Sequence, residues 1–316
     1  MYPRMMNNVF YLIFSLLLVK FKFTYSIIIT LILQTTVYAV LFGSIRVAII
    51  LLLPRKLMSY LFGKLMNIKF PSVMLMVLIK FWIRQFKVCT NDIVDPLQSF
   101  QSLSGFFNRR INMDNRYIPD KSLKDVIYSP SDSVLTQVAI FNDSKAKIKG
   151  LDFTLKQILK KQVLGNYAYC VFYLSPGDFH DFVSFNDFIS QEYTHIQGDL
   201  MPVNNIFTHK VTHLLALQER VVVEGSFHGR KAFYVPVGAL NVGNITMSKV
   251  NIQTNQFTQS LKQQCSNQYK TGETIGQFKL GSTVVIIFEL FEGENIKIIN
   301  NGKVMIGQKC IEIVME

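Results

Sequence analysis

A glycine and a serine stand at the entrance of a hydrophobic segment near the end of the chain. In the stretch GQFKLGSTVVIIFEL, Gly281 and Ser282 directly precede residues 283–288, whose β-branched and aromatic side chains predict a buried strand. A serine hydroxyl is a weak nucleophile until a base removes its proton, usually a histidine that a carboxylate orients. Gly281 permits backbone geometries that expose its carbonyl group to attack. The pair could therefore support acyl transfer within the chain.

Two upstream segments supply a carboxylate and a base. The segment YSPSDSVL contains Asp132 in a turn-like setting after a proline and two serines. The segment FYLSPGDFHDF contains His180 just beyond a predicted strand at 170–174. A solvated turn residue is the other interpretation of Asp132.

The remaining histidines and the cysteines do not form a recognisable metal site. His209 and His213 have the i, i+4 spacing of zinc ligands on a helix, but no glutamate lies between them, so the HExxH pattern is absent. We therefore predict no metal. The four cysteines are scattered and contain no CxxC pair, which is typical of a reduced compartment: Cys89, Cys170, Cys265 and Cys310.

Several segments together resemble the phosphatidylserine decarboxylase family. The family has Ser-Pro-x-Asp-Gly, Tyr-Leu-x-Pro-x-Asp-Tyr-His, Gly-x-Leu-x-x-Val-Asn, Asn-Glu-Arg-Val, Val-Gly-Ala-x-x-Val-Gly-x-Ile and Lys-Gly-x-Glu-x-Gly-x-Phe-x-x-Gly-Ser-Thr. This chain has the similar segments YSPSDSVL, FYLSPGDFHDF, HIQGDLMPVN, QERVVVEG, VPVGALNVGNI and KTGETIGQFKLGST in the same order. Upstream, SGFFNRRINMDNRYIP resembles the family's Phe-Phe-x-Arg and Arg-Pro-Ile segments. Each motif alone is weak, whereas the ordered set, from about Leu52 to the C-terminus, is specific.

The resemblance implies an inactive proenzyme that cuts its own chain between Gly281 and Ser282. The large chain would end at residue 281, and the small chain, 282–316, would remain bound to it as a heterodimer. Ser282 would become a covalent pyruvoyl group, so no separate cofactor would bind. This group would form a Schiff base with phosphatidylserine and act as an electron sink during decarboxylation to phosphatidylethanolamine. The resemblance makes Ser282, Asp132 and His180 the candidate catalytic residues, with Ser282 as the nucleophile and Asp132 as the orienting carboxylate.

The chain departs from the family at one position that bears on this chemistry. The family carries two histidines spaced His-x-x-His, and the second is commonly taken as the base for self-cleavage. Here His180 fills the first place and Val183 the second. Three explanations remain open: His180 serves both roles, another histidine such as His195 takes over, or the chain does not mature. The last explanation corresponds to our alternative function, a non-catalytic paralogue that is not processed and has a lipid-binding or regulatory role. A further possible function is that of a decarboxylase of this family that acts on another amine-bearing substrate.

The basic charge of the protein is concentrated in an apolar N-terminal third. The formal net charge is +12, and residues 1–91 contain eleven Lys and Arg but no Asp or Glu. This distribution favours membranes and organelle targeting over nucleic-acid binding. We therefore expect a phospholipid substrate and a membrane as partners, and no nucleic acid. The mitochondrial inner membrane is the expected location, and the endoplasmic reticulum, Golgi or a bacterial inner membrane are alternatives.

Hydropathy predicts how this third contacts the membrane. Residues 23–45 are uncharged and long enough to span a bilayer core of about 30 Å as a transmembrane helix. Residues 5–19 form a second membrane segment or the apolar part of a targeting signal. The runs at 47–53 and 72–83 are shorter or interrupted, which favours helices that lie in the interface with lysines reaching the headgroups. A hydrophobic helical cap on a soluble core, over 47–88, is the alternative.

The overall pattern predicts an α+β protein with a mostly antiparallel, sandwich- or barrel-like β core and N-terminal transmembrane and membrane-associated helices. Residues 1–50 form the targeting and transmembrane region, and residues 51–316 the decarboxylase-like domain. Helices are expected at about 96–109 and 154–163. Two hairpins are expected, one with Gly229 in its turn and one with the turn Asn301-Gly302.

Overall fold

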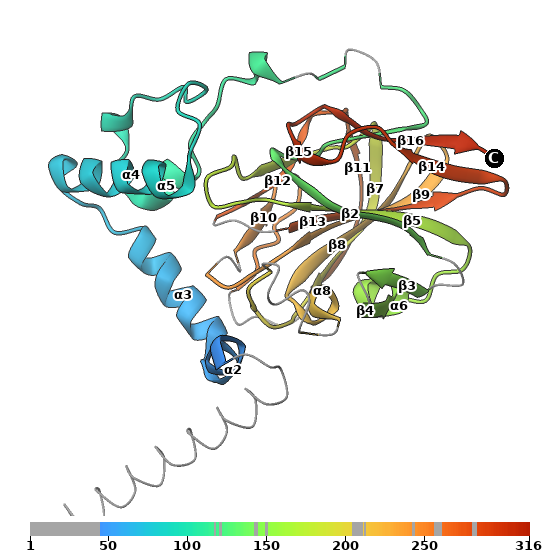
Figure 1. Ribbon diagram of the computed structural model, residues 1–316, viewed down its shortest axis with the longest axis horizontal. Coiled ribbons are helices and arrows are strands. Elements are labelled where there is room, and N and C mark those ends of the chain that lie inside the picture. Colours follow the sequence, from blue (N-terminus) through green and yellow to red (C-terminus); the bar gives the residue numbers. More distant parts are fainter. Residues whose placement is uncertain are drawn as a thin grey trace, which may run out of the picture. The chain divides into compact units, whose positions relative to one another are not determined.

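The chain divides into two compact units, Met1–Pro54 and Arg55–Glu316 (Figure 1). The computed structural model describes residues 45–116, 118–119, 122–141, 145–148, 151–203, 211, 213–241, 244–255, 261–279 and 283–316. Gly281 and Ser282 therefore lie outside the described residues. Leu280 lies outside them as well, so Lys279 and Thr283 are the nearest described residues on the two sides of the pair.

The described part of the first unit contains helix α2 (Ile45–Leu52), which has an apolar sequence. Residues 23–44 of the predicted transmembrane segment, and the whole run at 5–19, lie outside the described residues. Of the helices that the structure does describe, none combines the length and hydropathy needed to cross a bilayer. The transmembrane helix therefore stays a prediction.

The second unit begins with a group of helices. They are α3 (Arg55–Met66), α4 (Ser72–Phe86), the 3₁₀ turn η1 (Leu97–Ser99), α5 (Leu103–Phe107) and the 3₁₀ turn η2 (Met113–Asn115). Helix α4 follows Pro71 and ends at Lys87, whose left-handed backbone caps it. Its buried residues Leu75 and Ile79 pack with Phe106 of α5. The helix predicted at 96–109 is divided into η1 and α5, because Ser102 caps the start of α5 by accepting a hydrogen bond from the amide of Gly105.

An eight-stranded antiparallel sheet forms the centre of the protein, which confirms the predicted, mostly antiparallel β core. Its order is β11 (Lys262–Tyr269), β7 (Phe188–Ile196), β8 (Arg220–Phe227), β9 (Arg230–Val237), β13 (Thr283–Leu290), β5 (Asn166–Tyr173), β2 (Ser133–Phe141) and β15 (Gly302–Val304). Strand β13 pairs along its length with β5 and β9. Its continuous apolar run suits this position, since both faces of the strand are buried.

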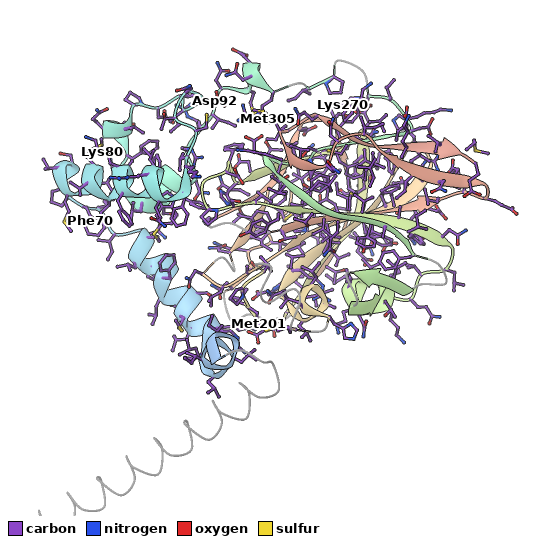
Figure 2. All side chains as sticks on the ribbon, viewed as in Figure 1. Phe70, Lys80, Asp92, Met201, Lys270 and Met305 are labelled. Atoms are coloured by element: carbon purple, nitrogen blue, oxygen red, sulfur yellow. The ribbon has the colours of Figure 1, made fainter. Side chains whose placement is uncertain are left out.

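Two three-stranded sheets complete the main core. One has the order β1 (Val126–Tyr128), β16 (Lys309–Met315), β14 (Glu294–Ile298), and the other β10 (Ile245–Met247), β12 (Thr274–Phe278), β6 (Asp181–Val183). Their apolar side chains share one hydrophobic cluster with one face of the large sheet, represented by Phe182, Phe278, Ile286 and Ile311. Figure 2 shows how densely side chains fill the space between these strands.

The opposite face of the large sheet carries a second hydrophobic cluster. It contains Val285 and Ile287 of β13 and the buried residues of helix α6 (Leu155–Leu159). Helix α6 follows the small hairpin of β3 (Lys145–Ile148) and β4 (Leu151–Thr154), while α8 (Leu214–Leu217) precedes β8. The helix predicted at 154–163 is therefore present but shorter.

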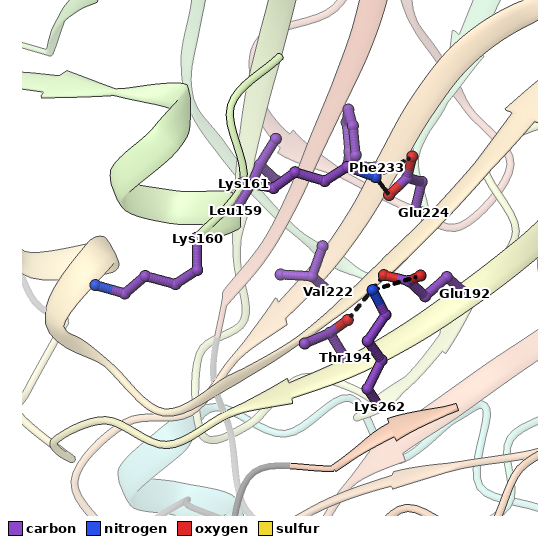
Figure 3. A pocket seen from close by; sticks show the side chains of 9 residues that line it. All are labelled: Leu159, Lys160, Lys161, Glu192, Thr194, Val222, Glu224, Phe233 and Lys262. Atoms are coloured by element: carbon purple, nitrogen blue, oxygen red, sulfur yellow. Dashed lines mark hydrogen bonds and ion pairs between the residues drawn. The ribbon is translucent and has the colours of Figure 1, made fainter. Parts of the chain in front are cut away.

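A pocket of about 340 Å³ opens on this α6-covered face (Figure 3). Its lining comes from α6 and its C-terminal end and from β7, β8, β9 and β11: Leu159, Lys160, Lys161, Glu192, Thr194, Val222, Glu224, Phe233 and Lys262. Both carboxylates are paired, Glu224 with Lys161 and Glu192 with Lys262. Of the candidate catalytic residues that the structure describes, neither Asp132 nor His180 lines this pocket.

The two predicted hairpins have opposite outcomes. Strands β8 and β9 form the first, and His228 and Gly229 make its turn with positive φ angles of 45° and 82°. The second prediction is wrong, because the strands around Asn301-Gly302 do not pair with each other. Strand β14 pairs with β16, and β15, which begins at Gly302, pairs with β2 of the large sheet. The turn signal is local, whereas sheet partners are chosen by long-range packing.

Candidate active site

The described residues on either side of Gly281-Ser282 belong to two different sheets. Before the pair, the amide of Phe278 in β12 donates to the carbonyl of His180 at 3.0 Å, and the amide of Lys279 donates to the carbonyl of Asn244 at 2.9 Å. After the pair, Thr283 opens β13 and pairs with Tyr173 and Val237. The peptide bond at issue therefore lies on the short connection between a small sheet and the centre of the large one.

A tight turn connects this region to His180. Strand β5 ends at Tyr173, next to Thr283, and the following turn is closed by hydrogen bonds between Ser175 and Asp178. Gly177 in this turn lies against the end of α4, where an added Cβ would approach the carbonyl oxygen of Phe86 to 2.2 Å. Burial raises the pKa of the Asp178 carboxyl group, although the Ser175 amide opposes that rise.

The His180 ring is buried against an aromatic side chain. Its exposed fraction is 1 %, and its ring lies 4.0 Å from that of Phe107, with an interplanar angle of 35°. Within the part of the chain that the structure describes, neither ring nitrogen has a hydrogen-bond partner. Burial lowers the pKa of His180 to about 3, and the nearby charge of Arg109 adds to the shift, while the Asp178 backbone acts against it. The imidazole is therefore neutral at physiological pH.

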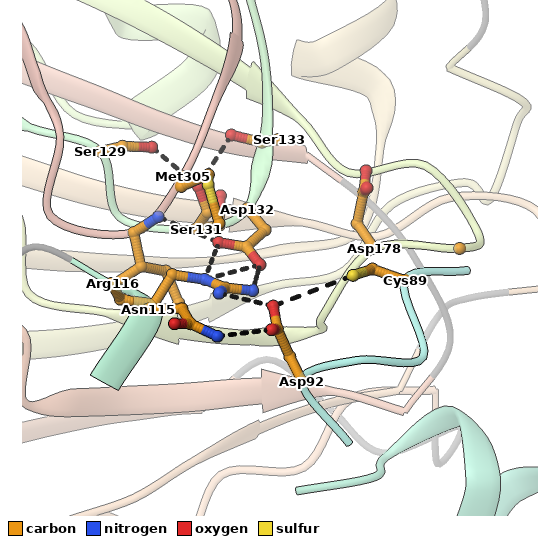
Figure 4. Close-up of polar contacts among 12 residues, drawn as sticks. Cys89, Asp92, Asn115, Arg116, Ser129, Ser131, Asp132, Ser133, Asp178 and Met305 are labelled. Atoms are coloured by element: carbon orange, nitrogen blue, oxygen red, sulfur yellow. Dashed lines mark hydrogen bonds and ion pairs between the residues drawn. The ribbon is translucent and has the colours of Figure 1, made fainter. Parts of the chain in front are cut away.

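Asp132 has the opposite environment, a buried ion-pair network (Figure 4). Its two oxygens accept hydrogen bonds from Nε and Nη2 of Arg116 at 2.5 to 3.1 Å, and Oδ1 also accepts the amide of Ile306 at 3.0 Å. The Nη1 atom of Arg116 donates to Asp92 at 2.8 Å. Both oxygens of Asp132 are thus engaged by Arg116, and His180 is not among its hydrogen-bond partners.

The pKa values of the network follow from these contacts. The hydrogen bond from Arg116, helped by one from Asn115, lowers the pKa of Asp92 despite the opposing effect of burial. Burial acts to lower the pKa of Arg116, but the hydrogen bonds to Asp132 and Asp92 outweigh it and raise the pKa. Arg116 therefore remains a cation between two carboxylates.

Val183 shares an apolar neighbour with this network. Its side chain is buried in a small apolar cluster with Ile111, Phe179 and Ile306. Ile306 is the residue whose amide holds Asp132, so position 183 and Asp132 share a neighbour. The backbone of Val183 is fixed as well, since its amide donates to the carbonyl of Pro130 at 2.8 Å.

His195, the other histidine considered as a base, is held elsewhere. Its Nε2 atom lies 2.9 Å from Oε1 of Glu219, and both side chains are buried. The same carboxylate oxygen accepts the amide of Asn255 at 2.8 Å. Moving His195 toward Ser282 would leave Glu219 buried without this partner, which is costly.

Two arginines that the sequence did not single out are central to this geometry. Arg116 holds Asp132, and Arg109 donates to the turn that carries His180. Both occur in the segment SGFFNRRINMDNRYIP, whose likeness to the family was the available signal. Among the described residues, no group of three or more His, Cys, Asp and Glu side chains is arranged to hold a metal ion.

Comparisons with known proteins agree with the motif order. The sequence profile of the family described as phosphatidylserine decarboxylase matches residues 103–312. A phosphatidylserine decarboxylase proenzyme of Helicobacter pylori is 32 % identical over 240 residues, which cover 73 % of this chain and 88 % of that protein. The proenzyme of Plasmodium falciparum is 28 % identical over 273 residues, covering 79 % and 74 %. The mitochondrial proenzyme of Caenorhabditis elegans is 30 % identical over 259 residues, covering 77 % and 67 %.

Proposed function

Because this chain belongs to the phosphatidylserine decarboxylase family and is a decarboxylase, we propose that it cleaves itself between Gly281 and Ser282 and converts phosphatidylserine to phosphatidylethanolamine. One observation carries the proposal. Residues on both sides of this bond contact the segment that bears His180. The amide of Phe278 donates to the carbonyl of His180, and Thr283 pairs with Tyr173 at the start of that segment. These contacts support a nucleophile and a base that lie close together on the two segments.

In this proposal His180 removes the proton from the Ser282 hydroxyl group, which attacks the carbonyl carbon of Gly281. A neutral imidazole can accept that proton, and its nitrogens are not committed to other groups in the described structure. The low pKa also carries a cost, because an imidazolium in this apolar setting is unstable and a base works best near the working pH. We therefore expect self-cleavage to be slow in this chain compared with relatives that carry the second histidine.

The attack would break the amide bond between Gly281 and Ser282 and leave an ester on the Ser282 oxygen. β-Elimination would release the Gly281 carboxylate and leave dehydroalanine at position 282, and its imine tautomer would take up one water and lose ammonia. The product is the pyruvoyl group that begins the small chain. It supplies an electron-withdrawing carbonyl group that accepts the electrons released on decarboxylation. The chain fits such a group because Thr283 is buried and paired on both sides, so β13 would hold the new N-terminus rigidly. The large and small chains would stay together for the same reason, since β13 pairs on both sides with strands of the large chain and β16 pairs with β1 of the large chain.

The outer faces of α3 and α4 support a membrane location. Each helix exposes three large apolar side chains at i, i+4, i+8 spacing: Leu57, Leu61 and Leu65 in α3, and Val73, Val77 and Phe81 in α4. Basic residues accompany both stripes, and no acidic residue precedes Asp92. Such faces fit helices that lie in a lipid interface. A membrane-anchored enzyme follows, with residues 23–45 as the proposed transmembrane anchor.

The location we favour is a mitochondrial membrane. Relatives from Caenorhabditis elegans, Rattus norvegicus and Cricetulus griseus are named mitochondrial, and the acid-free N-terminal third suits such targeting. Relatives from Helicobacter pylori and Plasmodium falciparum carry the proenzyme name alone.

The test is denaturing gel electrophoresis of the purified chain, which has a mass of 36.3 kDa. We expect a fragment of about 35 residues (282–316) that carries the C-terminus and disappears in Ser282→Ala. Ser266→Ala, at an exposed serine of β11, is the matched control and should still cleave. The processed protein should convert phosphatidylserine in vesicles to phosphatidylethanolamine. A single full-length band in the wild type and in Ser282→Ala, without turnover, would favour the unprocessed lipid-binding paralogue.

A further inference from the structure

Three consecutive residues at the C-terminal end of α5 contact both segments that must meet for self-cleavage. Phe107 ends the helix, Asn108 caps it and Arg109 follows. The ring of Phe107 lies against the ring of His180. The proposed function uses none of these three side chains directly, although they belong to the family-like segment noted in the sequence.

Asn108 reaches the segment that leads to the bond. Its Nδ2 atom donates to the carbonyl of Phe278 at 3.0 Å, although the two residues are 170 positions apart in the chain. The amide of the same Phe278 donates to the carbonyl of His180. Both polar backbone atoms of Phe278 are therefore bound, one by Asn108 and one by His180.

Arg109 reaches the segment that carries the base. Its guanidinium group is buried, with Nη2 donating to the carbonyls of Gly177 at 2.7 Å and Asp178 at 3.2 Å. Burial lowers the pKa of Arg109, which is the usual effect of removing a cation from water, and its hydrogen-bond acceptors are backbone carbonyls. A buried cation is costly in such a place, so a role beyond packing is expected.

We propose that Phe107, Asn108 and Arg109 form a clamp that aligns the His180 turn with the segment entering the Gly281-Ser282 bond. The inference rests on the proposed function, in which these two segments react with each other. The three are positioning residues, since each acts through His180, Phe278 or the 177–178 turn. Effective intramolecular reactions require the reacting groups to be held within a narrow geometry, and a displacement of about 1 Å can cost about a hundredfold in rate.

The clamp is also continuous with the helical group whose outer face is apolar. The indole nitrogen of Trp82 in α4 donates to the carbonyl of Pro176 at 3.2 Å, in the turn before His180. The ring of Trp82 packs edge-on against Phe107, with centroids 6.2 Å apart. Helix α4, which presents one of the apolar stripes outward, therefore also contacts the His180 turn.

The first test measures the rate constant of self-cleavage after cell-free synthesis. Asn108→Leu removes the amide donor at similar size, and Arg109→Met removes the guanidinium group but keeps a long side chain. We expect each variant to cleave about ten- to a hundredfold more slowly than the wild type. Arg109→Lys keeps a cationic donor for the turn and should recover part of the lost rate.

A matched control separates positioning from stability. Arg230 is also a buried arginine, but it pairs with Glu294 and Asp125 at the other end of strand β9 from Val237. Arg230→Met should lower the thermal unfolding midpoint while the rate of self-cleavage stays at the wild-type value. The clamp is refuted if Asn108→Leu and Arg109→Met cleave at the wild-type rate. It is also refuted if the rate follows the unfolding midpoint equally in all variants, Arg230→Met included.

A second measurement does not depend on cleavage. In the Ser282→Ala chain, amide hydrogen exchange at Phe278 reports its bond to the His180 carbonyl. Asn108→Leu and Arg109→Met should cause a loss of protection there, whereas Arg230→Met should not. Unchanged protection in the first two variants would overturn the clamp. A wild-type chain that never cleaves would instead overturn the proposed function, and the exchange result would still decide the clamp.

Discussion

The surroundings of Asp132 and of His180 differ in how their polar atoms are satisfied. Asp132 lies in a closed network, in which Arg116 and the Ile306 amide take up its oxygens. His180 lies against Phe107 with both ring nitrogens lacking a partner in the described structure. The family resemblance expects a carboxylate that orients a histidine, yet the two groups have separate environments here. The Asp132 carboxylate is therefore held in place by its hydrogen bonds, whereas the His180 imidazole remains available for proton transfer.

The two environments affect the stability of the fold in different ways. A buried carboxylate is costly without its cation, so the loss of Arg116 should destabilise the fold strongly even though the intact ion pair adds little net stability. A buried imidazole without hydrogen bonds is stable only while neutral, so His180 contributes a liability that grows in acid. Val183 lies on the Asp132 side of this division, because it shares Ile306 with that network. Three changes test the comparison, and the largest effect is expected at Arg116.

Replacing Arg116 by Met should destabilise the protein by about 3–5 kcal/mol, because Asp132 and Asp92 would remain buried without their cation. Chemical denaturation of the Ser282→Ala chain would measure this without interference from cleavage. The double variant Arg116→Met/Asp132→Asn should recover part of the loss. Arg110→Met is the control, since its pair with Asp95 is exposed, and it should cause a much smaller loss. Equal losses for Arg116→Met and Arg110→Met would contradict the closed network.

The second change concerns His180 and acid. The folded-state pKa of about 3 lies below the unfolded value of 6.5, so between these pH values the unfolded chain binds more protons. Stability should therefore fall as the pH is lowered. Between pH 6.5 and 4.5 the wild type should lose about 2–3 kcal/mol more than His180→Gln, which cannot be protonated. Denaturation curves of both proteins at several pH values measure the difference, and parallel curves would mean that His180 is not buried and unpartnered.

The sequence predicted the elements whose evidence is local. The apolar run of β13 identifies a strand buried on both faces, and the β8–β9 hairpin has a glycine where a positive φ is needed. The same reasoning failed at Asn301-Gly302, because no local signal says that β15 will pair with β2 instead of β14. Turn chemistry predicts a reversal of the chain, but the partner of a strand depends on the assembled core.

The candidate site likewise contains residues that local motifs predicted and contacts that they did not. Motif order singled out Asp132 and His180, and their burial is consistent with special roles. The contacts of Arg116 with Asp132, and of Arg109 with the 177–178 turn, join residues far apart in the chain. No period or spacing in a single sequence encodes such pairs, so they become visible only when the sheets and helices are assembled.

The last change, Val183→His, would join the two environments. An imidazole at position 183 would lie beside Ile306 and therefore next to the Asp132 carboxylate. General bases contribute about 10²–10⁴-fold, but Arg116 already engages both oxygens of Asp132, so we expect self-cleavage to be only about tenfold faster. Val183→Leu is the control for packing, because it adds volume without a base and should not accelerate cleavage. In the His180→Gln background, Val183→His should restore cleavage. If it accelerates nothing in either background, the slow step is not proton removal, and the contrast between Asp132 and His180 does not limit maturation.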